Sequence, residues 1–192
     1  FNAKEIHSVF KNIYRQWDEN TFYSYLNRFH IPMNKKIKTF SKGMKMKLYI
    51  AVALSHNAKL LILDEATSGL DPVVRDEILD IFYDFTRDEN HSVLISSHIV
   101  SDLEKLCDYI AFMHKGKLIL CEEKDNLLNN YSIIQCDENT LGNINNKDII
   151  SVRKSEYAVK AVVKNTAVTK EMNAMPVNLE DLFVYMIRGK KS

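Results

Sequence analysis

Glycine is scarce in this chain: its 192 residues contain five, at positions 43, 69, 116, 142 and 189. A phosphate-binding loop of the form G-x-x-x-x-G-K-[ST] needs two spaced glycines followed by a lysine, and no stretch of the sequence matches it. The chain therefore supplies no glycine-rich phosphate loop of its own.

Paired cysteines, long apolar runs and an excess of one charge are also missing. Cys107, Cys121 and Cys136 form no C-x-x-C pair, which favours a reduced, intracellular protein with unpaired thiols. No apolar run approaches the ~20 residues that cross a bilayer, and the sequence does not open like a signal peptide. The net charge is only +1, which argues against a polyelectrolyte partner for the whole chain.

The spacing of apolar residues predicts helices at first and then strands alternating with helices. Amphipathic helices are predicted over 3–15, from Asn20 to Pro32, over 42–56, from Pro72 onward and over 100–106, the first of them already under way where the sequence opens. The short apolar runs 59–64 and 92–97 predict strands buried on both faces, and 109–113 with 118–120 predict a hairpin. This order indicates an α/β domain with a mostly parallel sheet flanked by helices.

The pattern changes beyond Lys124. Strands are predicted near 131–136, 149–153 and 157–163, with loops at 129–130 and 143–146. A final helix contains Leu179, Leu182, Phe183 and Met186. We interpret residues 126–192 as a small α+β appendage.

The segment Ser41-Lys42-Gly43-Met44 stands at the head of a predicted helix. A helix N-terminus has unpaired N–H groups and a partial positive charge, so it attracts anions. Ser41 could donate its hydroxyl to a phosphate, and Gly43 lets the backbone come close. The alternative is an ordinary serine N-cap.

Carboxylates and a histidine follow the two predicted strands. Asp64 and Glu65 end the first strand, at the edge where open α/β sheets bind ligands. Asp64 would hold Mg²⁺ through water, and Glu65 would polarise a water that attacks a γ-phosphate. His98 follows the second strand and could orient that water or bind the phosphate. Taken alone, the two carboxylates are also typical of a solvated strand end, and a single histidine there is more often an ordinary hydrogen-bonded polar residue.

Between these strands lies a tight turn that leads into a helix. It contains Ser68, Gly69, Leu70 and Asp71, followed by Pro72. Its simplest interpretation is a capping loop with Asp71 as N-cap.

These segments, in this order, closely resemble the ATP-binding-cassette (ABC) transporter ATPases from about residue 5 to residue 125. The resemblance implies that residues 41–44 are the signature motif, which contacts ATP held by a second subunit, and that 68–71 are the D-loop. It makes 60–64 the Walker B strand, with Asp64 serving Mg²⁺, Glu65 as catalytic base and His98 as switch histidine. It also makes the closing segment 179–183 similar to the family's C-terminal tail.

The predicted architecture is thus an N-terminally truncated P-loop NTPase core of the ABC ATPase type. Residues 1–125 form the ATPase part, in which 1–40 belong to the helical subdomain and 41–125 carry the motifs. Two positions depart from the family pattern. Lys42 stands where glycine is commonest, a variant that occurs in bacterial exporter-type members, and Ala66 stands where proline is usual.

The larger departure is the missing Walker A loop. In the family, this loop, the adenine-stacking aromatic residue and the Q-loop would all lie upstream of Phe1. We therefore expect the chain to be part of a longer protein. We also expect it not to hold ATP in a site of its own, while it keeps the surface that closes over ATP bound by a partner.

Six lysines lie between positions 35 and 47. Nucleic-acid binding would require interleaved aromatic residues, and only Phe40 and Tyr49 are near. We interpret these lysines as a solvated basic rim that also favours ATP phosphates, and expect no nucleic-acid partner. Met44 and Met46 are predicted to pack on the helix face.

The resemblance favours an ATPase subunit of a membrane transporter, using ATP and Mg²⁺. Its expected partners are a transmembrane permease subunit and a second ABC ATPase subunit, identical or different. Its expected location is the cytoplasmic face of the cell membrane, as a peripheral protein. Two alternatives stay open: an ABC ATPase that does not serve transport, and a degenerate, non-hydrolysing partner of an active subunit.

Overall fold

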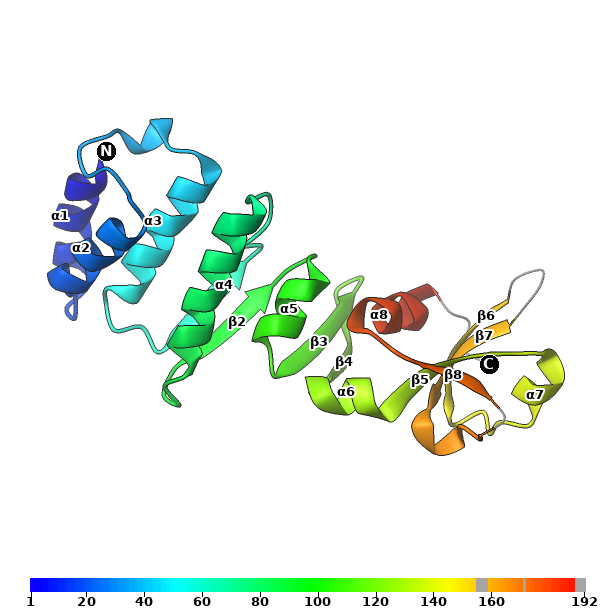
Figure 1. The fold of residues 1–192 in the computed structure, drawn as a ribbon. Helices are drawn as coiled ribbons and strands as arrows, with labels where there is room; N and C mark the ends of the chain where they lie inside the picture. Colours follow the sequence, from blue (N-terminus) through cyan, green and yellow to red (C-terminus); the bar gives the residue numbers. More distant parts are fainter. Residues whose placement is uncertain (155–158, 171, 189–192) are drawn as a thin grey trace. The chain divides into compact units, whose positions relative to one another are not determined.

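In the computed structural model, the first part of the chain alternates helices with parallel strands, as the periodicity predicts. The structure describes residues 1–154, 159–170 and 172–188, and its first unit is Phe1–Leu106. Figure 1 shows the elements of this unit, which are α1 (Ala3–Ile13), α2 (Glu19–Arg28), the short 3-10 helix η1 (Ile37–Thr39), α3 (Lys42–Leu54), β1 (Leu60–Asp64), α4 (Pro72–Thr86), β2 (Ser92–Ser96) and α5 (Val100–Leu106).

Side-chain caps fix where these helices begin. Asn2 and Glu5 form a capping box at α1, so this helix begins at Ala3 and does not already run through Phe1. Asp18 caps α2 by accepting the Thr21 N–H at 3.1 Å. The helix starts are therefore set locally, by residues that the sequence displays.

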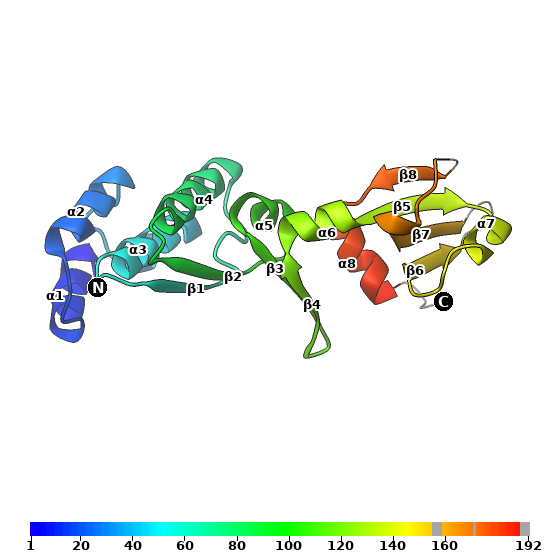
Figure 2. The ribbon, with the colours of Figure 1, turned by 90° about the horizontal axis from the view of Figure 1, so that it is seen from below.

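The core of the first unit lies between its helices and one face of the β1–β2 pair. Phe22, Leu26 and Phe82 are fully buried in it. The other face is open, because Leu60, Ile62 and Leu94 expose 52%, 71% and 62% of their surface. The prediction that both strands are buried on both faces is therefore wrong. Figure 2 shows α3 and α4 on one side of the strands, and no described element of this unit covers the opposite side.

The two strands run parallel, with Leu60 opposite Ser92 and Asp64 opposite Ser96. Their carboxyl ends therefore meet at one edge. The prediction of a mostly parallel sheet holds for this pair alone among the described strands, since the remaining pairs are antiparallel.

The second unit begins at Cys107. The predicted hairpin is confirmed: its turn residues Lys115 and Gly116 have φ of 48° and 73°, as a two-residue hairpin turn requires. The elements of this unit are β3 (Tyr109–His114), β4 (Lys117–Glu123), α6 (Lys124–Asn130), β5 (Tyr131–Cys136), α7 (Glu138–Gly142), β6 (Ile149–Lys154), β7 (Val159–Lys164), the 3-10 helix η2 (Asn165–Ala167), β8 (Asn173–Pro176) and α8 (Leu179–Arg188).

An antiparallel sheet of order β6-β7-β5-β8 forms the larger part of this unit. The strands predicted near 131–136 and 149–153 and the final helix are confirmed. The third strand, predicted over 157–163, corresponds to β7, and residues 157 and 158 of that prediction lie outside the described residues. Helices α6 and α7 and strand β8 were not predicted, and residues 129–130 end α6 instead of forming a loop. The boundary at residue 125 marks where the family resemblance ends and stays a prediction.

Candidate functional site

The carboxyl ends of β1 and β2 bring Asp64 and Glu65 beside Ser96. The Ser96 hydroxyl donates a hydrogen bond to Asp64 Oδ1. The Glu65 N–H donates to the Ser96 carbonyl at 3.0 Å, and Ser96 Oγ also accepts from it at 3.3 Å. Sequence reasoning missed the part that Ser96 plays. The available signal was a polar residue at the end of an apolar strand, in register with a carboxylate.

Glu65 has an unusual backbone conformation, and its two carboxylate oxygens have different surroundings. Its φ is 50°, in the left-handed region that non-glycine residues rarely occupy. Such a conformation persists only where neighbouring contacts hold it, and such residues are concentrated at functional sites. Oε1 lies 3.2 Å from His98 Nε2. Oε2 is buried and has no hydrogen-bond partner among the described residues.

His98 lies on the loop between β2 and α5. Its side chain is 94% exposed. Two hydrogen bonds hold the loop next to His98. The Ile99 N–H donates to Ser97 Oγ, and the Asp102 N–H donates to the Ile99 carbonyl, both at 3.0 Å. The structure therefore groups three predicted site residues, Asp64, Glu65 and His98, at one open edge.

This edge fits a hydrated Mg²⁺ ion. Mg²⁺ prefers oxygen ligands, keeps several waters and is usually held by one or two carboxylates together with substrate phosphates. Asp64 offers an exposed carboxylate, and Glu65 Oε2 is an unpartnered buried oxygen next to it. Within the described part of the chain, no group of three His, Cys, Asp or Glu side chains would hold a metal by itself.

Residues 41–44 and 68–71 form a second group of predicted site residues. Ser41 is the N-cap of α3, and its Oγ accepts the Met44 N–H at 3.2 Å. Asp71 caps α4 in the same way, accepting the Val74 N–H at 3.1 Å. The interpretations of both as helix caps are therefore confirmed. A Cβ added at Gly69 would lie 2.8 Å from Lys42 Nζ, so the two segments are in contact.

Glycine at position 69 is required by the backbone. Its φ is 67°, and an L-residue in this region costs about 1–2 kcal/mol. We expect Gly69→Ala to lower the free energy of unfolding of the first unit by this amount and to displace the Lys42 ammonium. Urea unfolding followed by Trp17 fluorescence measures the loss. Gly43→Ala, in the same unit, is the control, because its φ is not positive and an added Cβ would lie in ordinary contact, 3.4 Å from Val74 Cγ1; an equal loss in both variants would contradict the prediction.

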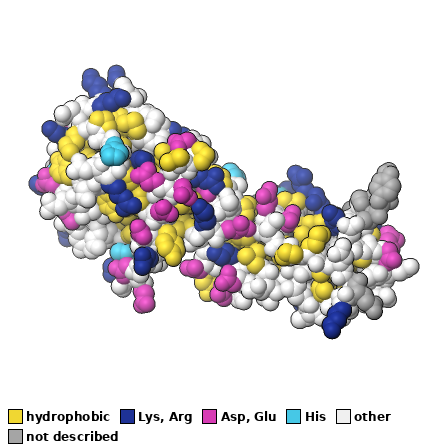
Figure 3. All heavy atoms as spheres, in the orientation of Figure 1, with side chains coloured by type: hydrophobic (Ala, Val, Ile, Leu, Met, Phe, Trp, Pro, Cys, Tyr) yellow, Lys and Arg dark blue, Asp and Glu magenta, His cyan; other side chains and the backbone are white. Residues whose placement is uncertain are grey.

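The lysines near residues 41–44 do not all form a solvated rim. Lys47 Nζ lies 2.6 Å from Glu77 Oε2 and 5.7 Å from the Phe29 ring centroid, and its side chain is only 13% exposed. It therefore joins α3 to α4, and the rim interpretation is wrong for this residue. Met44 and Met46 pack against the core, as predicted. On the face shown in Figure 3, basic and acidic side chains are intermingled over the first unit.

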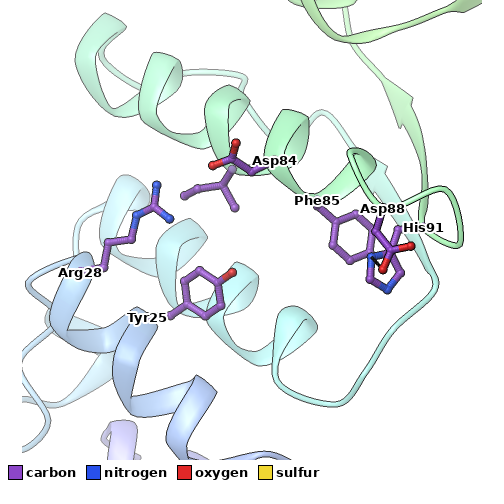
Figure 4. A pocket seen from close by; sticks show the side chains of 7 residues that line it. Tyr25, Arg28, Asp84, Phe85, Asp88 and His91 are labelled. Carbon is purple, nitrogen blue, oxygen red and sulfur yellow. Dashed lines mark ion pairs between the residues drawn. The ribbon is translucent and has the colours of Figure 1, made fainter.

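A pocket of about 290 Å³ lies elsewhere in the first unit, between α2 and the end of α4. Figure 4 shows Tyr25 and Arg28 on one side and Asp84 on the other, with His91 stacked on Phe85 at 4.4 Å. Ile81 and Asp88 complete its lining. None of the predicted site residues lines this pocket, so it is separate from the candidate site.

The known proteins that resemble this chain are ABC transporter proteins. The family described as ABC transporter matches residues 2–68, a stretch that contains both 41–44 and the Asp64–Glu65 pair. The ABC transporter ATP-binding protein YtrB of Bacillus subtilis is 28% identical over 204 residues, covering 100% of this chain and 70% of that protein. The chain is homologous to bacterial ABC transporter ATP-binding proteins.

Other ABC ATP-binding proteins match about half of the chain. The lantibiotic transport ATP-binding protein SrtF of Streptococcus pyogenes is 47% identical over 91 residues, which are 47% of this chain and 39% of that protein. The bacitracin transport ATP-binding protein BcrA of Bacillus licheniformis is 45% identical over 85 residues, 44% of this chain and 28% of that protein. These matches span well under half of the length of either relative.

A solved ABC transporter shares the fold. A chain of this transporter, in an inward-facing conformation, matches with a TM-score of 0.50 and 18% identity, covering 83% of this chain and 57% of that one. The chain is thus mixed α/β with an architecture consistent with the P-loop NTPase fold of ABC ATPases. Every helix among the described residues is too short or too polar to span a bilayer.

Proposed function

We propose that this chain is the part of an ABC transporter's ATP-hydrolysing subunit that carries the signature motif, the Walker B strand and the switch histidine. One observation supports this above the others. Asp64, Glu65 and His98 meet at the carboxyl edge of a parallel strand pair, with His98 Nε2 3.2 Å from Glu65 Oε1. The alternative of an ABC ATPase without a transport function has no specific observation in its favour.

Glu65 is proposed as the general base. A base must accept the proton of the attacking water through an oxygen that is not already engaged. His98 occupies Oε1, whereas Oε2 has no partner among the described residues. The Glu65 carboxylate therefore takes the proton, and the His98 imidazole, with Nε2 3.2 Å from Oε1, fixes the plane of the carboxylate while it does so.

Asp64 and Glu65 are proposed to face the phosphates of ATP and its magnesium. When bound, Mg²⁺ neutralises the charge that develops on the phosphate oxygens. Asp64 would hold it through water, with the carboxylate oriented by the Ser96 hydroxyl. Ser96, the last residue of β2, thus contacts the Asp64 carboxylate and the Glu65 backbone N–H, two residues before the switch histidine.

Residues 41–44 are proposed to contact ATP held by a second ABC ATPase subunit. The start of α3 offers N–H groups to an anion. Gly43 supports this role, because a Cβ there would lie in ordinary contact, 3.4 Å from Val74 Cγ1, and its φ is not positive. Neither the backbone nor the packing of this chain requires glycine at position 43. A ligand that approaches from outside the chain would explain it.

The proposed role in transport rests on sequence similarity to transport proteins. We propose that the complete subunit binds a transmembrane permease subunit at the cytoplasmic face of the membrane and drives it by ATP-dependent closure with a second ATPase subunit. YtrB, SrtF and BcrA are each described as ABC or transport ATP-binding proteins. Their names extend to this chain only the expectation of transport and not the identity of what is transported.

The coding sequence upstream of Phe1 and the ATPase activity of its complete product test this function. A G-x-x-x-x-G-K-[ST] loop there, together with ATP binding and phosphate release, is the expected result. A complete product that lacks the loop and releases no phosphate, yet stimulates an active ABC ATPase subunit, would overturn it in favour of the degenerate-partner alternative.

His98→Ala in the complete subunit should lower kcat by about 10²-fold while changing the Kd for ATP little. The reason is that His98 orients the base and is 94% exposed, so its loss leaves no buried group unpaired. Single-turnover hydrolysis and equilibrium nucleotide binding separate the two effects. His98→Gln keeps a hydrogen-bond donor and should lose less. A large loss of affinity with normal turnover would refute the orienting role.

A further inference from the structure

Asp102, in α5, is a buried carboxylate that the mechanism above does not use. The residue is 1% exposed. Its Oδ2 accepts a hydrogen bond from Thr67 Oγ1 at 2.6 Å, and its Oδ1 accepts one from Arg75 Nε at 2.7 Å. Arg75 Nη2 adds an ion pair to Oδ1 and donates to Ser101 Oγ at 2.8 Å. Both carboxylate oxygens are therefore satisfied by charged or hydroxyl donors.

The donors to Asp102 come from segments that carry the proposed catalytic groups. Thr67, itself fully buried, lies in the turn that begins at Glu65. Arg75 lies in the first turns of α4, directly after the D-loop. Asp102 follows His98 by four residues, and its N–H donates to the carbonyl of Ile99, the residue next to His98. One carboxylate thus ties the Glu65 turn, the D-loop helix and the His98 loop together.

We propose that Asp102 is a positioning residue for ATP hydrolysis: through Thr67 and Arg75 it holds Glu65 and His98 in register with each other. This inference rests on the proposed function, because it names what fixes the geometry of that same site. The left-handed φ of Glu65 is unfavourable for a glutamate, and the surrounding contacts must maintain it. Thr67 and Asp102 supply a buried contact of this kind within two residues of Glu65.

The size of the effect follows from the tolerance of catalysis to displacement. A misplacement of ~1 Å of a catalytic group costs on the order of 10²-fold in rate. Hydrogen-bond partners that orient site residues typically contribute about 10- to 100-fold. The positioning network should therefore act on kcat, because nucleotide binding relies on groups that it does not touch.

A second ion pair joins the same two helices and serves as a matched control. Lys105 Nζ lies 2.7 Å from Asp76 Oδ1, with side chains 64% and 60% exposed. The hydrogen bond from Lys105, and then its charge, lower the pKa of the Asp76 carboxyl. Both residues line a cavity of about 170 Å³ with Arg75 and Asp102, so the two pairs differ mainly in burial and in the contact with Thr67.

Thr67→Val and Thr67→Ser in the complete subunit test the proposal. Valine keeps the shape and removes the hydroxyl, whereas serine keeps the hydroxyl. We expect Thr67→Val to lower kcat by about 10- to 100-fold with the KM for ATP within about three-fold of wild type, and Thr67→Ser to retain most of kcat. Lys105→Met should leave both constants unchanged. Thermal unfolding of each variant shows that the subunit is folded at the assay temperature.

The outcomes are distinguishable from a failure of the proposed function. A folded wild-type subunit that neither binds nor hydrolyses ATP would overturn the function and this inference with it. An active wild type with unchanged kcat in Thr67→Val, or an equal loss in Lys105→Met, would overturn the inference alone. If Thr67→Val does not fold, Arg75→Lys, which keeps the charge but loses the forked donors, must show the same split between kcat and KM.

Discussion

Replacing Glu65 with glutamine in the complete subunit should slow ATP hydrolysis by ~10²–10⁴-fold while ATP-bound dimers still form. The amide has nearly the shape of the carboxylate but accepts no proton from water at neutral pH. The loss of proton acceptance by this carboxylate, whose Oε1 lies 3.2 Å from His98 Nε2, is what matters. Steady-state phosphate release measures turnover, and light scattering with ATP and Mg²⁺ measures the dimer.

Glu89→Gln is a suitable control for this substitution. Glu89 is an exposed residue in the loop before β2, so the same chemical change there should leave turnover within two-fold, about the scatter expected for a surface substitution. Unchanged turnover in Glu65→Gln would remove Glu65 from the role of base. Loss of ATP-dependent dimerisation together with turnover would instead mean that the carboxylate serves binding.

The adjacency of Asp64, Glu65 and His98 was predictable because two features of the sequence fix it. Both strands are short apolar runs that end in polar residues, and parallel pairing places such ends at one edge. Because Asp64 lies opposite Ser96 in this register, His98, two residues after Ser96, lies beside Glu65. Helices α1, α3, α4 and α5 were predictable for a similar reason, since a cap or proline marks the start of most of them.

The remaining features depend on contacts between residues that are distant in the sequence, and the spacing of apolar residues does not reveal such contacts. Ser96 and Asp102 look like ordinary polar residues in the sequence, and only their placement beside Asp64 and Thr67 shows what they hold. The open face of β1 and β2 has another origin. Leu60 and Ile62 are as apolar as their buried neighbours, so hydrophobicity alone predicts burial on both faces although the described helices cover one.

The short elements α6, α7 and β8 were missed because each is too brief to show a period. Helix α7 has only five residues, and its start is marked by an aspartate cap at Asp137. All four residues of strand β8 are exposed, and the strand pairs with β5 at the sheet edge. Backbone pairing forms such an edge strand, so its side chains carry little of the alternating signal that identifies a half-buried strand.

Truncating Phe82 to alanine should destabilise the first unit by about 3–5 kcal/mol, a large part of the 5–15 kcal/mol that typical domains possess. Phe82 lies on α4, is fully buried and belongs to the core shared with α2 and α3. Trp17, the only tryptophan, lies in this unit, so its fluorescence in urea follows the loss. Tyr83, next on the helix and 58% exposed, gives the control Tyr83→Ala, expected to cost under about 1 kcal/mol. Equal losses would mean that α4 is held by its surface and not by this core.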